Sequence, residues 1–167
     1  MNYLGVDLGL SGALVLIDSS CNVITKTLMP TIEVKKGKST KRKYDVSALA
    51  SWLAEHVVPS QTFVALEDVV AMPGQNPSAS ISRGFGQGIL VGILTARGIP
   101  HMIVRPQVWQ REIFKNAQSG GDTKTKSIQF AQSTQPNEDW RETPRCKSAY
   151  DGYCDAFCIA YYAKKSA

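Results

Sequence analysis

Four acidic residues occupy positions where apolar segments of the sequence end or are interrupted. Asp7 follows an apolar run that begins at Tyr3, and Glu67 closes the run "TFVALE". Asp151 and Asp155 lie within "SAYDGYCDAFCIAYYA", which is apolar on nearly all sides and therefore predicts a buried helix. Their i, i+4 spacing places both carboxyl groups on one face of that helix. A buried helix does not hold two like charges on one face without compensation.

Each of these acids also has an ordinary structural interpretation. Asp7 could cap the glycine-rich turn that follows it, and Asp151 could be the N-cap of its helix. Asp155 could pair with a lysine or arginine, and Glu67 could end its strand in solvent. If the four meet instead, carboxylates about 4 Å apart repel by roughly 4 kcal/mol at an effective dielectric of about 20. Such a cluster requires either bound protons or bound cations.

The types of these residues indicate which cation would suit them. Carboxylate oxygens with no neighbouring histidine or cysteine favour hard ions, Mg²⁺ or Mn²⁺. This donor set is typical of a phosphoryl-transfer site and not of an acyl-transfer site. Cys154 and Cys158 also share a helix face, but the only histidines are His56 and His101, so we interpret these thiols as buried packing and not as a zinc site.

The elements that must position the acids alternate between strands and helices. Short apolar runs predict strands, the first three of them antiparallel neighbours, at 3–7, 13–17, 22–28, 62–69 and 101–105. Helical spacing of apolar residues predicts helices at 44–58, 78–97, 106–116, 123–133 and 148–164. The order βββαβαβ followed by helices predicts an α/β fold with one five-stranded mixed sheet flanked by helices.

Length and composition place the chain among ordinary soluble proteins. Its 167 residues suit a single domain spanning 1–167 with a proper core. No apolar run reaches the roughly 20 residues of a membrane span, and the N-terminus lacks a signal-peptide pattern. The four cysteines have no disulfide-framework spacing, so we expect reduced thiols in the cytoplasm, with no membrane contact.

The net charge of +5 comes from one segment, "EVKKGKSTKRKY" at 33–44, because the remaining charges cancel. This segment has no apolar period, so we expect a flexible loop. The loop could be merely solvated, or it could be an arm that grips the phosphates of DNA. Its six basic residues are the candidate DNA contacts: Lys35, Lys36, Lys38, Lys41, Arg42 and Lys43.

Over nearly its whole length the chain resembles RuvC-type Holliday-junction resolvases, which are RNase H-like nucleases and integrases. The resemblance is to the short viral-type branch with its D-G-x-x-D ending. It depends on the order and spacing of several motifs: "GVDLGLSGALVLID", "ALEDV", "SISRGFGQGILVGIL", "VRPQVWQ", "KTKSIQFAQ" and "YDGYCDAFCIAYYA".

This resemblance implies an endonuclease that resolves four-way DNA junctions as a homodimer, leaving 5′-phosphate and 3′-hydroxyl ends. The acids that would hold two Mg²⁺ or Mn²⁺ ions are Asp7, Glu67, Asp151 and Asp155. Lys124 or Lys126 would match the basic residue that helps to position the scissile phosphate or the attacking water, and both are candidate DNA contacts. No small-molecule cofactor is implied.

Two features depart from the pattern of the bacterial resolvases. Their last two acids are commonly spaced i, i+3, whereas here the spacing is i, i+4, although both spacings put the acids on one helical face. The bacterial enzymes also carry an aromatic wedge shortly after the second acid, while "VVAMPGQNP" offers only Val70 and Met72. A preferred cleavage sequence therefore does not carry over.

Three glycines recur every four residues in the helix at 78–97: Gly84, Gly88 and Gly92. They form a smooth stripe that could pack tightly on the domain's own sheet. By the resemblance, the stripe is instead the contact between two subunits related by twofold symmetry.

Other functions fit parts of the same pattern. Another RNase H-like nuclease, acting on RNA–DNA hybrids, flaps or forks, would carry the same acids. A non-catalytic junction-binding protein would not need all of them. An actin-like ATP-binding domain shares the hairpin pattern "DLGxSG", but 167 residues are too few for the two domains that enclose its nucleotide.

Overall fold

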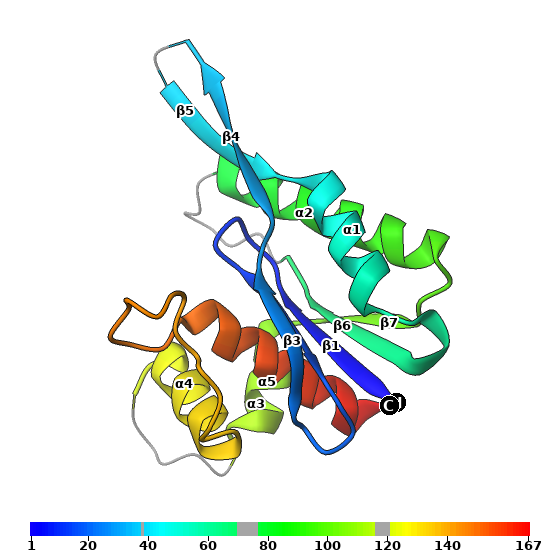
Figure 1. Ribbon diagram of the computed structural model, residues 1–167, viewed down its shortest axis with the longest axis vertical. Helices are drawn as coiled ribbons and strands as arrows, with labels where there is room; N and C mark the ends of the chain where they lie inside the picture. The colour runs from blue at the N-terminus through cyan, green and yellow to red at the C-terminus, as the bar shows by residue number, and fades with distance from the viewer. Residues whose placement is uncertain (38, 70–76, 116–120) are drawn as a thin grey trace.

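The computed structural model describes residues 1–37, 39–69, 77–115 and 121–167. Its main sheet has five strands in the order β3-β2-β1-β6-β7 (Figure 1). These strands are β1 (Asn2–Asp7), β2 (Ala13–Ile17), β3 (Val23–Leu28), β6 (Thr62–Glu67) and β7 (His101–Val104). β1 pairs antiparallel with β2 and parallel with β6, and β6 pairs parallel with β7, so the sheet is mixed. The predicted five-stranded α/β fold is confirmed.

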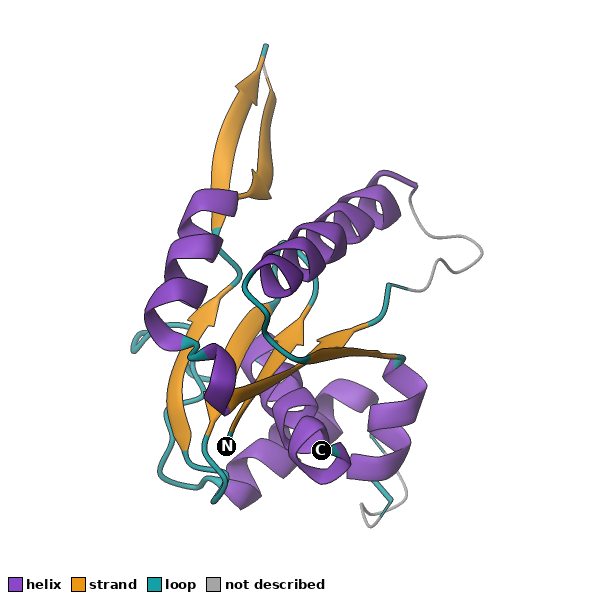
Figure 2. Cartoon of the chain, turned by 90° about the vertical axis from the view of Figure 1, so that its right-hand side faces the viewer, coloured by secondary structure: helices purple, strands orange, loops and turns teal. Residues whose placement is uncertain are grey.

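Helices cover both faces of this sheet (Figure 2). Two lie on one face, α1 (Val46–His56) and α2 (Pro77–Ala96). Three lie on the other, α3 (Pro106–Ile113), α4 (Thr123–Thr134) and α5 (Asp151–Ser166). None of the helices in the described ranges combines the length and apolarity that a membrane crossing needs.

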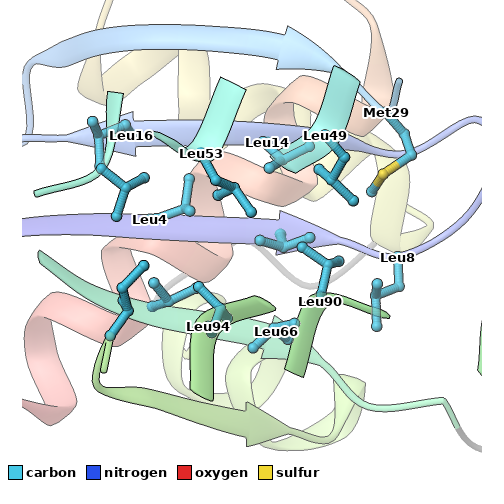
Figure 3. Packing of buried hydrophobic residues seen from close by; sticks show 14 of the residues in the cluster. Leu4, Leu8, Leu14, Leu16, Met29, Leu49, Leu53, Leu66, Leu90 and Leu94 are labelled. Atoms are coloured by element: carbon cyan, nitrogen blue, oxygen red, sulfur yellow. The ribbon is translucent and has the colours of Figure 1, made fainter. Parts of the chain in front are cut away.

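The core between the sheet and helices α1 and α2 consists mainly of leucines (Figure 3). Side chains alternate across a strand, so Leu4 and Val6 of β1 point into this core while Tyr3 and Gly5 point to the other face. Helix α1 begins at the N-cap Asp45, whose side chain accepts a hydrogen bond from the Ala48 backbone N–H at 2.9 Å.

Helix α5 lies directly against the other face of β1. A Cβ atom at Gly5 would lie 2.0 Å from the Ala156 carbonyl oxygen and 2.3 Å from the Ala160 backbone nitrogen, so only glycine admits the helix this closely. The helix is buried along most of its length, as the sequence predicts. Cys154 and Cys158 are buried thiols in it, and burial raises the pKa of Cys154 to about 12, which agrees with a packing role.

The basic segment at 33–44 forms strands where a loop was expected. Strands β4 (Thr31–Lys36) and β5 (Ser39–Tyr44) pair antiparallel, from Thr31 opposite Tyr44 to Lys36 opposite Ser39. This hairpin extends away from the main sheet (Figure 1). The expectation rested on charge, but the β-branched residues of the two strands (Thr31, Ile32, Val34 and Thr40) favour an extended backbone, and Gly37 supplies a positive φ of 63° at the turn. Lys38 lies outside the described residues.

The glycine stripe of α2 does not pack on the protein's own sheet. A Cβ atom at Gly84, Gly88 or Gly92 would meet no described atom within 4 Å. The same face of the helix exposes Ile81 and Phe85, at 72% and 60% of their surface. The stripe is therefore part of an outward, largely apolar helix face.

Candidate active site

The sheet register places the first two acids side by side. Val6 of β1 is paired with Leu66 of β6, so Asp7 and Glu67 are the next residues along two adjacent parallel strands. Because the carboxyl ends of parallel strands meet at one edge of a sheet, both acids lie at that edge.

Helix α5 brings the other two acids to the same edge. The Tyr150 hydroxyl donates a hydrogen bond to the Ser11 carbonyl oxygen at 2.5 Å. A Cβ atom at Gly152 would lie 2.7 Å from the Tyr150 ring and 3.1 Å from that same carbonyl oxygen, so a larger residue would not fit. The first turn of α5 is thus fixed against the β1–β2 turn. A cleft of about 650 Å³ lies there, lined in part by Asp7, Asp151 and Asp155.

The other three acids all act electrostatically on Asp7. Burial raises the pKa of Asp7 well above its ordinary value, and the charges of Glu67, Asp155 and Asp151 raise it further. The guanidinium of Arg83 acts in the opposite direction and lowers the pKa. The structure therefore brings together the four acids that the sequence singles out.

Asp155 carries a buried carboxyl oxygen that none of the described residues satisfies. Burial raises its pKa to about 6, with further increases from Glu67 and Asp151, while the Ser127 hydroxyl and the Lys124 charge act in the opposite direction. The Asp155 Oδ1 atom is buried and has no hydrogen-bond partner in the part of the chain that the structure describes. Asp155 also forms no ion pair with a lysine or arginine of the described residues, since Arg83 pairs with Glu67 and Lys124 with Asp151.

Glu67 is held by two side chains that the sequence analysis did not assign. It is only 8% exposed, so it does not end its strand in solvent. The Trp109 indole Nε1 donates to Glu67 Oε1 at 3.2 Å, and Arg83 Nη2 donates to Oε2 at 3.2 Å. Burial raises the pKa of Glu67, whereas Trp109 and Arg83 lower it. Trp109 belongs to the motif "VRPQVWQ", which is the feature of the sequence from which a role in the site could have been inferred.

Lys124 is the nearer of the two candidate lysines. Its Nζ atom lies 2.5 Å from Asp151 Oδ2, and this contact raises the pKa of Lys124. It lines the cleft, whereas Lys126 does not belong to the lining among the described residues. Asp122 positions the lysine by capping α4, accepting a hydrogen bond from the Thr125 backbone N–H at 2.8 Å. Asp151 itself is not the N-cap of α5, because that position is occupied by Tyr150.

The donor set of the cluster fits a hard cation. In this conformation no three or more acidic, histidine or cysteine side chains in the described ranges have the geometry to hold a metal ion. Two of the acids form salt bridges with basic side chains instead: Glu67 pairs with Arg83, and Asp151 pairs with Lys124. The donors are all oxygens, and the unpaired buried Asp155 Oδ1 is an acceptor that a bound cation would satisfy.

One residue of the hairpin also reaches the cleft. Arg42 Nη2 donates to the Leu10 carbonyl oxygen at 2.5 Å and to Thr31 Oγ1 at 3.2 Å, and Arg42 lines the cleft. The other candidate DNA contacts of the hairpin whose side chains are described are exposed: Lys35, Lys41 and Lys43. Lys36 is described in its backbone alone. Val70 and Met72, in the segment that lacks an aromatic wedge, lie outside the described residues.

Comparison with known proteins supports the fold. No family model matches the chain, and no curated protein does. A structure of Thermus thermophilus RuvC matches with a TM-score of 0.56 and 14% identity, covering 97% of this chain and 92% of that one. T. thermophilus RuvC in complex with Holliday junction substrate matches with a TM-score of 0.55, 12% identity and the same coverage. The chain therefore has the RNase H-like fold of these RuvC structures.

The raised pKa of Asp155 predicts how stability depends on pH. In the unfolded chain Asp155 ionises near 3.8, and in the folded chain near pH 6, so the folded state binds more protons between these values. The contribution of Asp155 to the free energy of unfolding therefore falls as pH rises through this window. Asp155→Asn should raise that free energy by about 3 kcal/mol at neutral pH and by little below about pH 4.

Urea unfolding from about pH 3.5 to 7.5, with a chelator present, measures this difference. Taking the difference between the variant and the wild type cancels the contributions of titrating groups outside the acid cluster and leaves those of Asp155 and the acids coupled to it. A difference that does not change across the window would contradict the uncompensated burial of Asp155.

Proposed function

We propose that this protein is a divalent-metal-dependent endonuclease that resolves four-way DNA junctions. The observation that carries the proposal is the convergence of Asp7, Asp151 and Asp155 on one cleft, with Glu67 buried beside Asp7 at the end of the adjacent strand. A fold alone does not imply an activity, but such a cluster of acids has no evident structural purpose and lowers stability. The solved structure of a RuvC with a Holliday junction substrate supports the choice of substrate.

In this proposal the four carboxyl groups hold two Mg²⁺ or Mn²⁺ ions. Bound there, the ions would supply a water of lowered pKa as nucleophile and stabilise the charge on the leaving oxygen. The products are a 5′-phosphate and a 3′-hydroxyl, which a ligase can rejoin.

The remaining residues of the cleft hold and orient the reacting groups. Trp109 fixes the orientation of Glu67 through its indole N–H. Lys124, with its ammonium group 2.5 Å from Asp151 and 70% of its side chain exposed, is placed to contact a phosphate oxygen of the bound strand. Lys126 is assigned no catalytic role, and its DNA contact would lie beyond the cleft.

The basic hairpin is proposed to bind one arm of the junction. Arg42 marks the point where the hairpin meets the cleft, and the lysines extend from there along the paired strands. Phosphate contacts of this kind position a substrate without reading its sequence, which suits selection by shape.

Pairing of two cuts requires two active sites, and we place the subunit contact on α2. The outward face with Gly84, Gly88 and Gly92 lets a second helix approach closely, and Ile81 and Phe85 supply apolar area. A twofold arrangement would make this face pack against its own copy.

Asp7→Asn is predicted to abolish cutting of a labelled four-way junction in Mg²⁺ or Mn²⁺ while leaving junction binding largely intact, since only one metal ligand is lost. The matched control is Asp68→Asn, because Asp68 is the next acid along the chain from Glu67 but contacts Gln87 and Arg105 instead of the cleft acids. Gel assays of cleavage and of binding provide the two readouts. An Asp7→Asn protein that still cuts would remove the assigned site.

The same assay separates the proposed substrate from its alternatives. Preferential cutting of linear duplex, an RNA–DNA hybrid, a flap or a fork would indicate a different RNase H-like nuclease. Binding of junctions without cutting would indicate a non-catalytic protein.

The hairpin should account for much of the salt dependence of DNA binding. Each neutralised phosphate contributes about −0.9 to the slope of log K against log salt. Replacing Lys35, Lys41 and Lys43 together by glutamine should therefore flatten that slope by about 3 units, as measured by fluorescence anisotropy with a junction. An unchanged slope would mean that the hairpin is merely solvated.

Gly88→Arg should convert a dimer into a monomer, because it places a long charged side chain on the proposed contact. Arginine is more favourable than glycine inside a helix by about 1 kcal/mol, so the substitution should not destabilise the monomer. Gly88→Ala is the control that preserves close approach. Sedimentation equilibrium measures the mass, and a Gly88→Arg protein that stays dimeric would exclude this face.

A further inference from the structure

Arg83 places a protein cation inside the acid cluster. It extends from α2, lines the cleft with Asp7, and lies 3.2 Å from Glu67 through its Nη2 atom. Its charge acts on Asp7 as well as on Glu67. The guanidinium therefore supplies part of the positive charge that the cluster requires.

The rest of the guanidinium is not satisfied by the protein. Arg83 Nε is buried and donates to no acceptor in the described part of the chain. Nearby, the Tyr44 hydroxyl is also buried without a partner, and the Tyr44 ring packs so closely on Gly86 that a Cβ atom there would lie 2.4 Å from the ring. The helix that carries Arg83 is thus fixed in place, while the side chain keeps an unused donor.

Two cations cannot share Glu67 without cost. An oxygen paired with a guanidinium is less available to a divalent ion, and the two positive charges repel at this separation. A phosphate group offers the guanidinium a better partner, because the planar fork of arginine matches two phosphate oxygens at once. Moving Arg83 from Glu67 to a phosphate would free the carboxylate.

We propose that Arg83 is an exchangeable counter-ion that couples substrate binding to cation binding. It holds Glu67 in the protein without DNA and transfers to a strand phosphate when DNA binds, which leaves Glu67 to the divalent cation. The inference rests on the proposed function and adds to it a positioning residue, with ordered loading of DNA and metal.

The test is the affinity for Mn²⁺, measured by electron paramagnetic resonance of the unbound ion. Wild type, Arg83→Gln and Arg83→Lys are each titrated alone and with a four-way junction whose phosphorothioate linkages keep the charge but resist hydrolysis. Binding to the junction alone is subtracted. For the wild type, the junction should tighten Mn²⁺ binding about tenfold.

Arg83→Gln should bind Mn²⁺ about tenfold more tightly than the wild type without DNA, and should gain little when the junction is added. Arg83→Lys keeps the charge but not the fork, so its affinity without DNA should stay near that of the wild type while the gain from DNA shrinks. Arg111→Gln, which removes a charge in a different hollow beside Glu112 and Lys165, should behave as the wild type.

An Arg83→Gln protein with wild-type Mn²⁺ affinity would overturn the inference. Melting temperatures identify any variant that fails to fold. If Arg83→Gln does not fold, an Arg83→Lys protein that retains the full gain from DNA would overturn the inference by itself.

Asp7→Asn distinguishes a failure of this inference from a failure of the proposed function. If the wild type binds Mn²⁺ no better than Asp7→Asn, the metal site of the proposed function fails and the inference fails with it.

Discussion

Mutual repulsion among buried carboxyl groups is the constraint on which this structure depends. Burial raises the pKa values of Asp7, Glu67 and Asp155, and the charges of neighbouring acids raise those of Asp7 and Asp155 further. The protein offsets this with Trp109, Arg83 and Lys124, yet one oxygen of Asp155 still lacks a partner. Buried polar groups of this kind lower stability, and proteins retain them mainly where a ligand completes the arrangement.

The fold maintains this unfavourable arrangement through contacts far apart in sequence. The parallel pairing of β1 with β6 puts Asp7 beside Glu67, and the glycine at position 5 lets α5 settle onto β1. Residues from the two ends of the chain therefore define one cleft. The leucine core on the opposite face of the sheet, together with the buried length of α5, supplies the apolar burial that stabilises the whole.

The sequence predicted the features that depend on local patterns. Alternation and helical spacing identify the five strands, the buried helix and the acids at their ends, and the four acids do converge. The hairpin was missed because the run of charges at 33–44 outweighed the few β-branched residues of its strands, Thr31, Ile32, Val34 and Thr40. Arg83 and Trp109 could not be assigned to Glu67, because their partnership depends on how α2 and α3 pack across the sheet. Which of Lys124 and Lys126 lies against Asp151 likewise depends on the position of α4 relative to α5.

The most direct measurement of the central claim is anomalous scattering from a crystal grown with Mn²⁺. The account predicts a manganese peak in the cleft within coordination distance of Asp7 and Asp155, with the previously unpaired Asp155 oxygen among the ligands. A crystal that shows manganese elsewhere on the protein and none between these carboxyl groups would contradict it.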